Sequence, residues 1–194
     1  MAGVEFAERT RGLRPTVVNA ILKEVEVLKQ TGKTPISLMR GEPDFPTPEH
    51  IVSAAQESLS LGRTRYPNNR GEPRLRKAVQ NSLQVRTGLS YCDSEEILIT
   101  TGATFGIYAA LSSLVNPGDE VLLPEPVYDA YHSVIRLLGG RIRPVSGRLQ
   151  HGRFVLDLDQ MAAISGSGTR VLILNNPWNP TGTVFRRQEL ERIM

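Results

Sequence analysis

A chain of 194 residues is long enough to bury a core, and 40% hydrophobic with 22% charged residues is the composition of a folded protein. The net charge is +3, and no basic run exceeds two residues, which argues against nucleic-acid binding. The single cysteine excludes an intramolecular disulfide and argues against a thiolate metal site, so we expect no metal. Residues 1–15 lack the apolar core of a secretion signal, and no run of about 18 apolar residues occurs. We therefore expect a cytoplasmic protein without a membrane partner.

The first part of the chain predicts an arm built on one amphipathic helix. Residues 15–30 form this helix, because Val18, Ile21, Val25 and Leu28 recur at helical spacing, with Pro15 in the first turn and Gly32 after the end. A short strand is expected at 36–38. The proline-rich segment 41–46 that follows is predicted to be a shaped loop.

Two more helices are expected before the pattern changes. Thr47 is placed as the cap of a helix that has Pro48 at its first position and runs to about Leu61. A polar loop at 62–71 carries one aromatic residue, Tyr66. The next helix spans 72–87, and its apolar face consists of Leu75, Val79 and Leu83.

From residue 97 onward, short apolar runs alternate with helical segments. We place strands at 97–99, 121–123, 142–145 and 171–174, and helices at 104–115 and 128–138. This alternation predicts an α/β fold with a parallel sheet covered on both faces. Residues 1–50 are assigned to an arm and part of a small domain, and 51–194 to an unfinished α/β domain. Residues 189–194 read as the opening of another helix.

Ligands of open α/β sheets bind where strands end, so the segments after three strands are candidate binding loops. After 97–99, small residues at 100–106 open a helix whose N–H groups could hold a phosphate, with Thr104 adding a hydroxyl. A tight turn without a ligand would have the same sequence. After 121–123, Tyr128 could stack on a planar ring, or serve as a core residue at a helix start. After 171–174, Asn-Pro-Trp-Asn-Pro-Thr-Gly (176–182) predicts a rigid loop whose amides can donate hydrogen bonds.

The last of these motifs resembles the signature of fold-type I, class I/II aminotransferases, the aspartate aminotransferase-like enzymes that use pyridoxal phosphate. Four other segments are similar to that family in order and spacing: 41–48, 65–66, 71–76 and 116–121. The resemblance covers about residues 13–194 and corresponds to the N-terminal half of such enzymes. It implies a three-layer α/β/α large domain, incomplete here, with an N-terminal arm that belongs to the small domain.

The resemblance also implies roles for individual residues. Ala103 and Thr104 would bind the phosphate of pyridoxal phosphate, Tyr128 would stack on its ring, and Asn179 would hydrogen-bond its phenolic oxygen. Gly41 would meet the substrate carboxylate through its backbone. Tyr66 would reach the cofactor phosphate of a partner subunit in a homodimer. Cis peptide bonds are expected before Pro126 and Pro180.

The activity implied is transfer of an amino group from an L-amino acid to a 2-oxo acid. The lysine that forms the Schiff base lies beyond residue 194 in this family, so no catalytic residue is expected here. The four lysines present read as surface charges: Lys23, Lys29, Lys33 and Lys77. Two alternatives remain open, a non-catalytic half-length protein of this fold and a fold-type I lyase. The fragment alone is expected to be inactive and to fold poorly or aggregate, because strands that would pair within its sheet are missing.

Overall fold

The computed structural model describes residues 4–13, 17–36, 38 and 41–194, so that Pro15 and Ser37 lie outside the described residues. The chain divides into two compact units. One contains residues 1–35 and 106–194 and is called the sheet unit, because it holds all the strands of the described residues. The other, residues 36–105, is called the helical unit.

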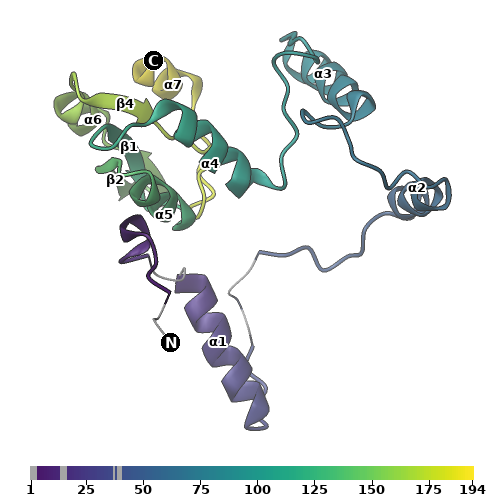
Figure 1. The fold of residues 1–194 in the computed structure, drawn as a ribbon. Coiled ribbons are helices and arrows are strands. Elements are labelled where there is room, and N and C mark those ends of the chain that lie inside the picture. The colour runs from purple at the N-terminus through teal and green to yellow at the C-terminus, as the bar shows by residue number, and fades with distance from the viewer. Residues whose placement is uncertain (1–3, 14–16, 37, 39–40) are drawn as a thin grey trace. The chain divides into compact units, whose positions relative to one another are not determined.

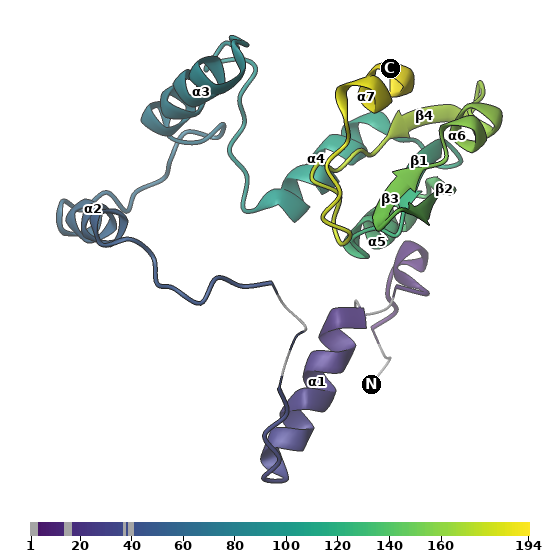
Figure 2. The same cartoon turned by 180° about the vertical axis from the view of Figure 1, so that it is seen from behind.

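The sheet unit begins with the 3₁₀ turn η1 (Glu8–Thr10) and helix α1 (Val17–Gln30). Its sheet consists of β1 (Glu120–Glu125), β2 (Arg141–Gln150), β3 (Arg153–Leu156) and β4 (Thr169–Leu172). Four further helices belong to it wholly or in part: α4 (Ala103–Leu114), α5 (Ala130–Leu137), α6 (Leu158–Ile164) and α7 (Arg187–Ile193). Figure 1 shows the helices and the strands β1, β2 and β4 along the chain, and β3 is labelled in Figure 2.

The strand order is β3-β2-β1-β4, with β1 parallel to both β2 and β4. The expected parallel strands at 121–123 and 142–145 are thus present, and the one expected at 171–174 is present as β4, which begins and ends two residues earlier than expected, at Thr169 and Leu172. The sequence reasoning missed β3, which pairs antiparallel with β2. His151 and Gly152 both have positive φ, 50° and 75°, which is the backbone of a tight two-residue hairpin turn.

Side chains of β1 alternate between two cores, one on each face of the sheet. Val121 and Leu123 are fully buried against α4 and α5, whereas Leu122 faces a second core toward α6 and the segment before α7. Figure 1 shows α4 and α5 on the side of the sheet nearer the viewer, and Figure 2 shows the opposite side. The expected α/β/α layering is confirmed within the sheet unit.

The helical unit contains α2 (Glu49–Ser60) and α3 (Pro73–Thr87). Thr47 does not cap α2; Pro48 occupies the N-cap position, and the helix begins one residue later than expected. Helix α3 ends as its sequence predicts, with Gly88 in the left-handed conformation at φ 75°. Gly71 lies against Ile99, where an added Cβ would stand 2.5 Å from the Ile99 side chain.

Two predicted strands are not observed among the described residues. Residues 97–99 have no strand partner among the described residues; the Ile99 N–H donates instead to the Arg70 carbonyl, at 3.0 Å. A strand exists only where its backbone pairs with a neighbour, and an apolar run alone does not supply one. Ile36 and Leu38 are likewise irregular, and their side chains are more than nine-tenths exposed. The apolar pattern at these two places predicts a strand, but the described residues contain no strand that pairs with it.

Candidate functional site

The segment after β1 carries the predicted ring-stacking residue. Tyr128 precedes α5 and is 39% exposed, and its ring meets the buried Tyr131 ring edge-on, with centroids 5.7 Å apart. Burial raises the pKa of Tyr131, and the neighbouring Tyr128 raises it further. Glu125 and His132 are 2.9 Å apart and join the end of β1 to α5. Tyr128 is thus fixed from one side and open on another, as a stacking residue must be.

The loop after β4 carries the predicted amide. The Asn179 backbone N–H donates to Asn175 Oδ1 at 3.1 Å, while its side chain is exposed and makes no hydrogen bond within the described residues. The loop closes on itself through the Trp178 N–H, which donates to the Thr183 carbonyl at 2.7 Å, and the Gly182 N–H, which donates to the Trp178 carbonyl at 2.8 Å. The Asn179 amide is therefore available to a ligand on a closed loop.

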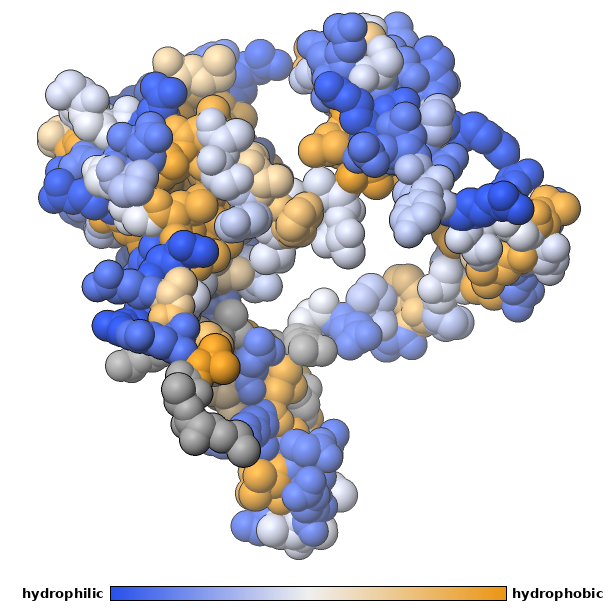
Figure 3. Space-filling view, in the orientation of Figure 1, coloured by the Kyte–Doolittle hydropathy of each residue, from blue (hydrophilic) through white to orange (hydrophobic). Residues whose placement is uncertain are grey.

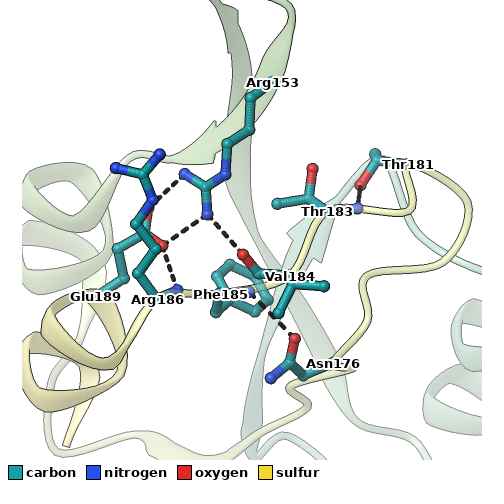
Figure 4. Close-up of polar contacts among 8 residues, drawn as sticks. All are labelled: Arg153, Asn176, Thr181, Thr183, Val184, Phe185, Arg186 and Glu189. Carbon is teal, nitrogen blue, oxygen red and sulfur yellow. Dashed lines mark hydrogen bonds and ion pairs between the residues drawn. The ribbon is translucent and has the colours of Figure 1, made fainter.

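Polar side chains hold the return of this loop toward α7 (Figure 4). The Phe185 N–H donates to Asn176 Oδ1 at 3.1 Å, and the Thr183 N–H donates to Thr181 Oγ1 at 3.2 Å. Arg153 on β3 donates to the Val184 carbonyl at 2.8 Å. Side chains of the sheet unit thus fix the loop on both sides of its turn, at Asn176 and at residues 183–185.

Arg153 also forms a bidentate ion pair with Glu189 of α7, with N···O distances of 2.8 and 2.7 Å (Figure 4). Glu189 in turn accepts from the Arg186 N–H at 2.6 Å. The hydrogen bonds from Arg153 lower the pKa of Glu189 to about 2, against the opposing effect of burial. Bidentate pairs of this kind are among the stronger polar contacts in proteins, so the pair fastens α7 to the β2–β3 hairpin.

An aromatic cluster lies beneath the loop. Trp178 stacks on Phe185 with centroids 5.4 Å apart and meets Phe154 edge-on at 6.2 Å. Gly147 on β2 has no side chain to occupy the space beside the indole ring; a Cβ there would stand 2.5 Å from Trp178 Cη2 and 2.6 Å from the Glu125 carbonyl oxygen. The glycine is what lets the ring enter the core.

Substitution Gly147→Ala is therefore expected to destabilise the protein by about 1–3 kcal/mol, the usual cost of overpacking a core. Urea unfolding of the full-length gene product measures this free energy. Gly166→Ala is the matched control, since nothing lies within 4 Å of a Cβ at that position and its φ is not positive. Equal stability of the two variants would contradict the expectation.

The other predicted site residues belong to the helical unit. Ala103 and Thr104 are exposed at the start of α4, after a turn in which the Gly102 N–H donates to the Thr100 carbonyl at 2.8 Å. Gly102 has φ 81°, and nothing lies within 4 Å of a Cβ built on it. The first N–H groups of α4 are thus open to an anion. Gly41 and Tyr66 are also exposed.

The structure brings two of the six predicted residues to a common edge. Tyr128 and Asn179 follow β1 and β4, which are adjacent parallel strands, so both lie at the carboxyl edge of the sheet. Their chemistry fits pyridoxal phosphate, because a half-open aromatic ring suits its pyridine and an unpaired amide suits its phenolic oxygen. The helical unit contains the other four predicted residues, Gly41, Tyr66, Ala103 and Thr104.

The four lysines are all exposed, on α1, on the turn after it and on α3. Lys77 Nζ donates to Gln80 Oε1 at 2.7 Å. None of them lies in the loops after β1 or β4. The described residues contain no cluster of histidine, cysteine, aspartate and glutamate that could hold a metal ion, and no helix among them is long and apolar enough to cross a membrane.

Sequence reasoning missed the supports of the Asn179 loop. Trp178 stood in the motif, but nothing in its spacing indicated that the ring is buried. The pairing of Arg153 with Glu189 joins residues 36 positions apart and leaves no local pattern. The hairpin did leave a signal, because His151-Gly152 separates two runs of strand-forming residues.

Similar sequences and structures are known for most of this chain. Residues 33–194 match the family model described as aminotransferase class I and II. Aspartate aminotransferase of Musicola paradisiaca is 33% identical over 187 residues, which cover 96% of this chain and 46% of that protein. Thermus thermophilus aspartate aminotransferase with maleate has a TM-score of 0.91 at 31% identity, covering 98% of this chain and 50% of that one. Mycobacterium tuberculosis N-succinyldiaminopimelate aminotransferase has a TM-score of 0.86 at 35% identity, covering 97% and 48%.

The chain is thus a three-layer α/β unit of the kind that carries its binding loops at the carboxyl edge of the sheet. The chain belongs to the class I and II aminotransferases, a family of pyridoxal-phosphate-dependent enzymes. It spans about half the length of the curated relatives that it matches.

Proposed function

We propose that the protein of which these residues are part is a pyridoxal-phosphate-dependent aminotransferase that moves an amino group from an L-amino acid to a 2-oxo acid. The observation that carries the proposal is the common placement of Tyr128 and Asn179 at the carboxyl edge of adjacent parallel strands, within a chain of this family. The relatives named above act on aspartate in one case and on N-succinyldiaminopimelate in another. The substrate of this protein is therefore assigned only as far as its class, an L-amino acid with a 2-oxo acid as acceptor.

In this proposal each exposed group performs one binding task. The N–H groups at Ala103 and Thr104 and the Thr104 hydroxyl hold the phosphate, aided by the dipole of α4. The Tyr128 ring stacks on the pyridine, and the Asn179 amide donates to the phenolic oxygen, which favours its charged form. When bound, the cofactor supplies the electron sink that stabilises negative charge at the substrate α-carbon.

The remaining assignments concern substrate and assembly. The backbone of Gly41 binds the substrate carboxylate. Tyr66, whose side chain is fully exposed, reaches the cofactor phosphate of a second copy, so the working form is a homodimer. Residues 1–50 would form the arm and part of the small domain, and 51–194 part of the large domain. The protein would act in the cytoplasm in amino-acid metabolism, which fractionation of cells tests.

The full-length gene product is expected to transfer ¹⁵N from a labelled amino acid to a 2-oxo acid, and borohydride is expected to fix pyridoxal phosphate on one lysine outside residues 1–194. Mass spectrometry measures both the labelled product and the modified peptide. The 194-residue chain is the control, and we expect no stoichiometric adduct on its four lysines. Release of ammonia in place of amino transfer would favour a lyase. The absence of both cofactor binding and amino transfer would favour a non-catalytic protein of this fold.

A further inference from the structure

Trp178 differs from its neighbours in the loop that follows β4. It is the only tryptophan of the 194 residues, and its side chain is 1% exposed, whereas Pro177 and Asn179 on either side are exposed. A loop residue that is fully buried between exposed neighbours fixes the loop to the core, because interiors are packed closely enough to hold a ring in one place. Trp178 is also the residue directly before the amide that the proposed function assigns to the cofactor.

The indole ring is held on several sides. Phe185 stacks on it, Phe154 meets it edge-on, and the buried cluster around it includes Leu122 of β1 and Met161 of α6. On the β2 side the ring lies directly against Gly147, because a Cβ on that glycine would stand only 2.5 Å from Trp178 Cη2. The ring therefore has one position in the core.

The backbone of Trp178 is fixed equally well. Its N–H donates to the Thr183 carbonyl at 2.7 Å, and its carbonyl accepts from the Gly182 N–H at 2.8 Å and from Thr181 Oγ1 at 3.1 Å. Asn179 has one bond of its own, from its backbone N–H to Asn175, and no side-chain hydrogen bond within the described residues. The backbone of the loop is thus fixed at the residue directly before Asn179.

We infer that Trp178 is a positioning residue, whose buried ring holds the loop so that the Asn179 amide meets the phenolic oxygen of the cofactor. This inference rests on the proposed function, in which Asn179 makes that contact. Trp178 Nε1 is buried without a hydrogen-bond partner among the described residues. The ring therefore acts by shape, and a phenyl ring at the same place retains most of its effect.

The test is a double-mutant cycle on the full-length gene product, because coupled residues lose less together than the sum of their separate losses. The dissociation constant of pyridoxal phosphate is measured by equilibrium dialysis for Asn179→Ala, Trp178→Ala and the double variant. A hydrogen bond to a charged group contributes enough that Asn179→Ala raises this constant about 10- to 100-fold. Trp178→Ala raises it to a similar degree, and the double variant by no more than Asn179→Ala alone.

Two further variants separate positioning from general stability. Trp178→Phe stays within about threefold of the wild-type constant, because it keeps the aromatic packing. Met161→Ala lies in the same core on α6, which carries no proposed binding residue; it lowers the free energy of unfolding by about as much as other large-to-small changes but leaves the constant within about twofold. The pKa of the bound cofactor, followed through its absorbance as the pH is changed, shifts in the same direction for Trp178→Ala and Asn179→Ala.

Each other outcome overturns the inference. Additive losses in the double variant, or a Trp178→Ala protein that binds as the wild type while Asn179→Ala does not, show that the ring does not act through the amide. A Trp178→Phe protein as weak as Trp178→Ala shows that shape is not its role. An Asn179→Ala protein that binds normally refutes the assignment of Asn179 itself, and this inference with it. If Trp178→Ala fails to fold, Trp178→Leu replaces it in the cycle.

Discussion

The 194-residue polypeptide expressed by itself is expected to aggregate, or to form a loose state without a cooperative unfolding transition. In the helical unit, Ile97 is the only buried apolar side chain among the described residues. Leu75 on the apolar face of α3 is 46% exposed, and Ile51 and Leu59 on α2 are 50% and 65% exposed. Figure 3 shows apolar side chains at the surface.

The helical unit is expected to have low stability because these apolar side chains are not buried. A fully buried aliphatic or aromatic side chain contributes about 1.5–3 kcal/mol relative to an exposed one, whereas a whole domain is stable by about 5–15 kcal/mol. A unit with so little core cannot offset the entropy of ordering its chain. Exposed apolar surface also promotes association.

Size-exclusion chromatography, binding of a hydrophobic dye and thermal unfolding by circular dichroism measure this outcome. The full-length gene product is the control and should elute as a defined species with a sharp transition. A monomeric 194-residue chain that excludes the dye and unfolds cooperatively would refute the expectation.

The pair of Arg153 and Glu189 is expected to stabilise the protein in a pH-dependent way. Because the folded-state pKa of Glu189 is lowered to about 2 from an ordinary 4.5, the stabilisation is complete above about pH 4.5 and is lost as pH falls toward 2. That difference corresponds to at most about 3 kcal/mol, and the partial exposure of both side chains reduces it to about 1–2 kcal/mol. Glu189→Gln should therefore cost about 1–2 kcal/mol at pH 6 and progressively less below pH 4.5.

Urea unfolding of the full-length gene product at pH 6 and pH 3 measures the difference. Glu191→Gln is the matched control on the same helix, because Glu191 forms only an exposed pair with Arg187 at 3.9 Å. Its effect should stay within about 0.5 kcal/mol at both pH values. A loss at Glu189 that equals the control, or that does not shrink on acidification, would show that the ion pair does not fasten α7.

The sequence predicted those parts of the structure that depend on local pattern or on a family motif. The three parallel strands, the helices at 17–30, 73–87 and 103–114, and the positions of Tyr128 and Asn179 after strand ends all follow from apolar spacing and turn residues. The expected cis bonds before Pro126 and Pro180 are present, together with a third before Pro177.

What the sequence could not predict depends on contacts between distant residues. An apolar run at 97–99 has the composition of a strand, but whether it forms one is decided by a neighbour elsewhere in the chain. The burial of Trp178 depends on the missing side chain of Gly147, which precedes it by more than thirty residues in the printed sequence. The Arg153–Glu189 pair likewise arises only once the hairpin and α7 are folded against the same core.

The two edges of the sheet differ, because β3 is antiparallel to its neighbour and β4 is parallel to its own. On one side, β3 ends the sheet with a short strand of four residues that returns from β2 through a tight turn. On the other side, β4 pairs with β1 and with no further strand among the described residues. The open edge of β4 therefore lies on the side of the sheet from which the loop that carries Asn179 emerges, so a strand that paired with β4 would run beside that loop.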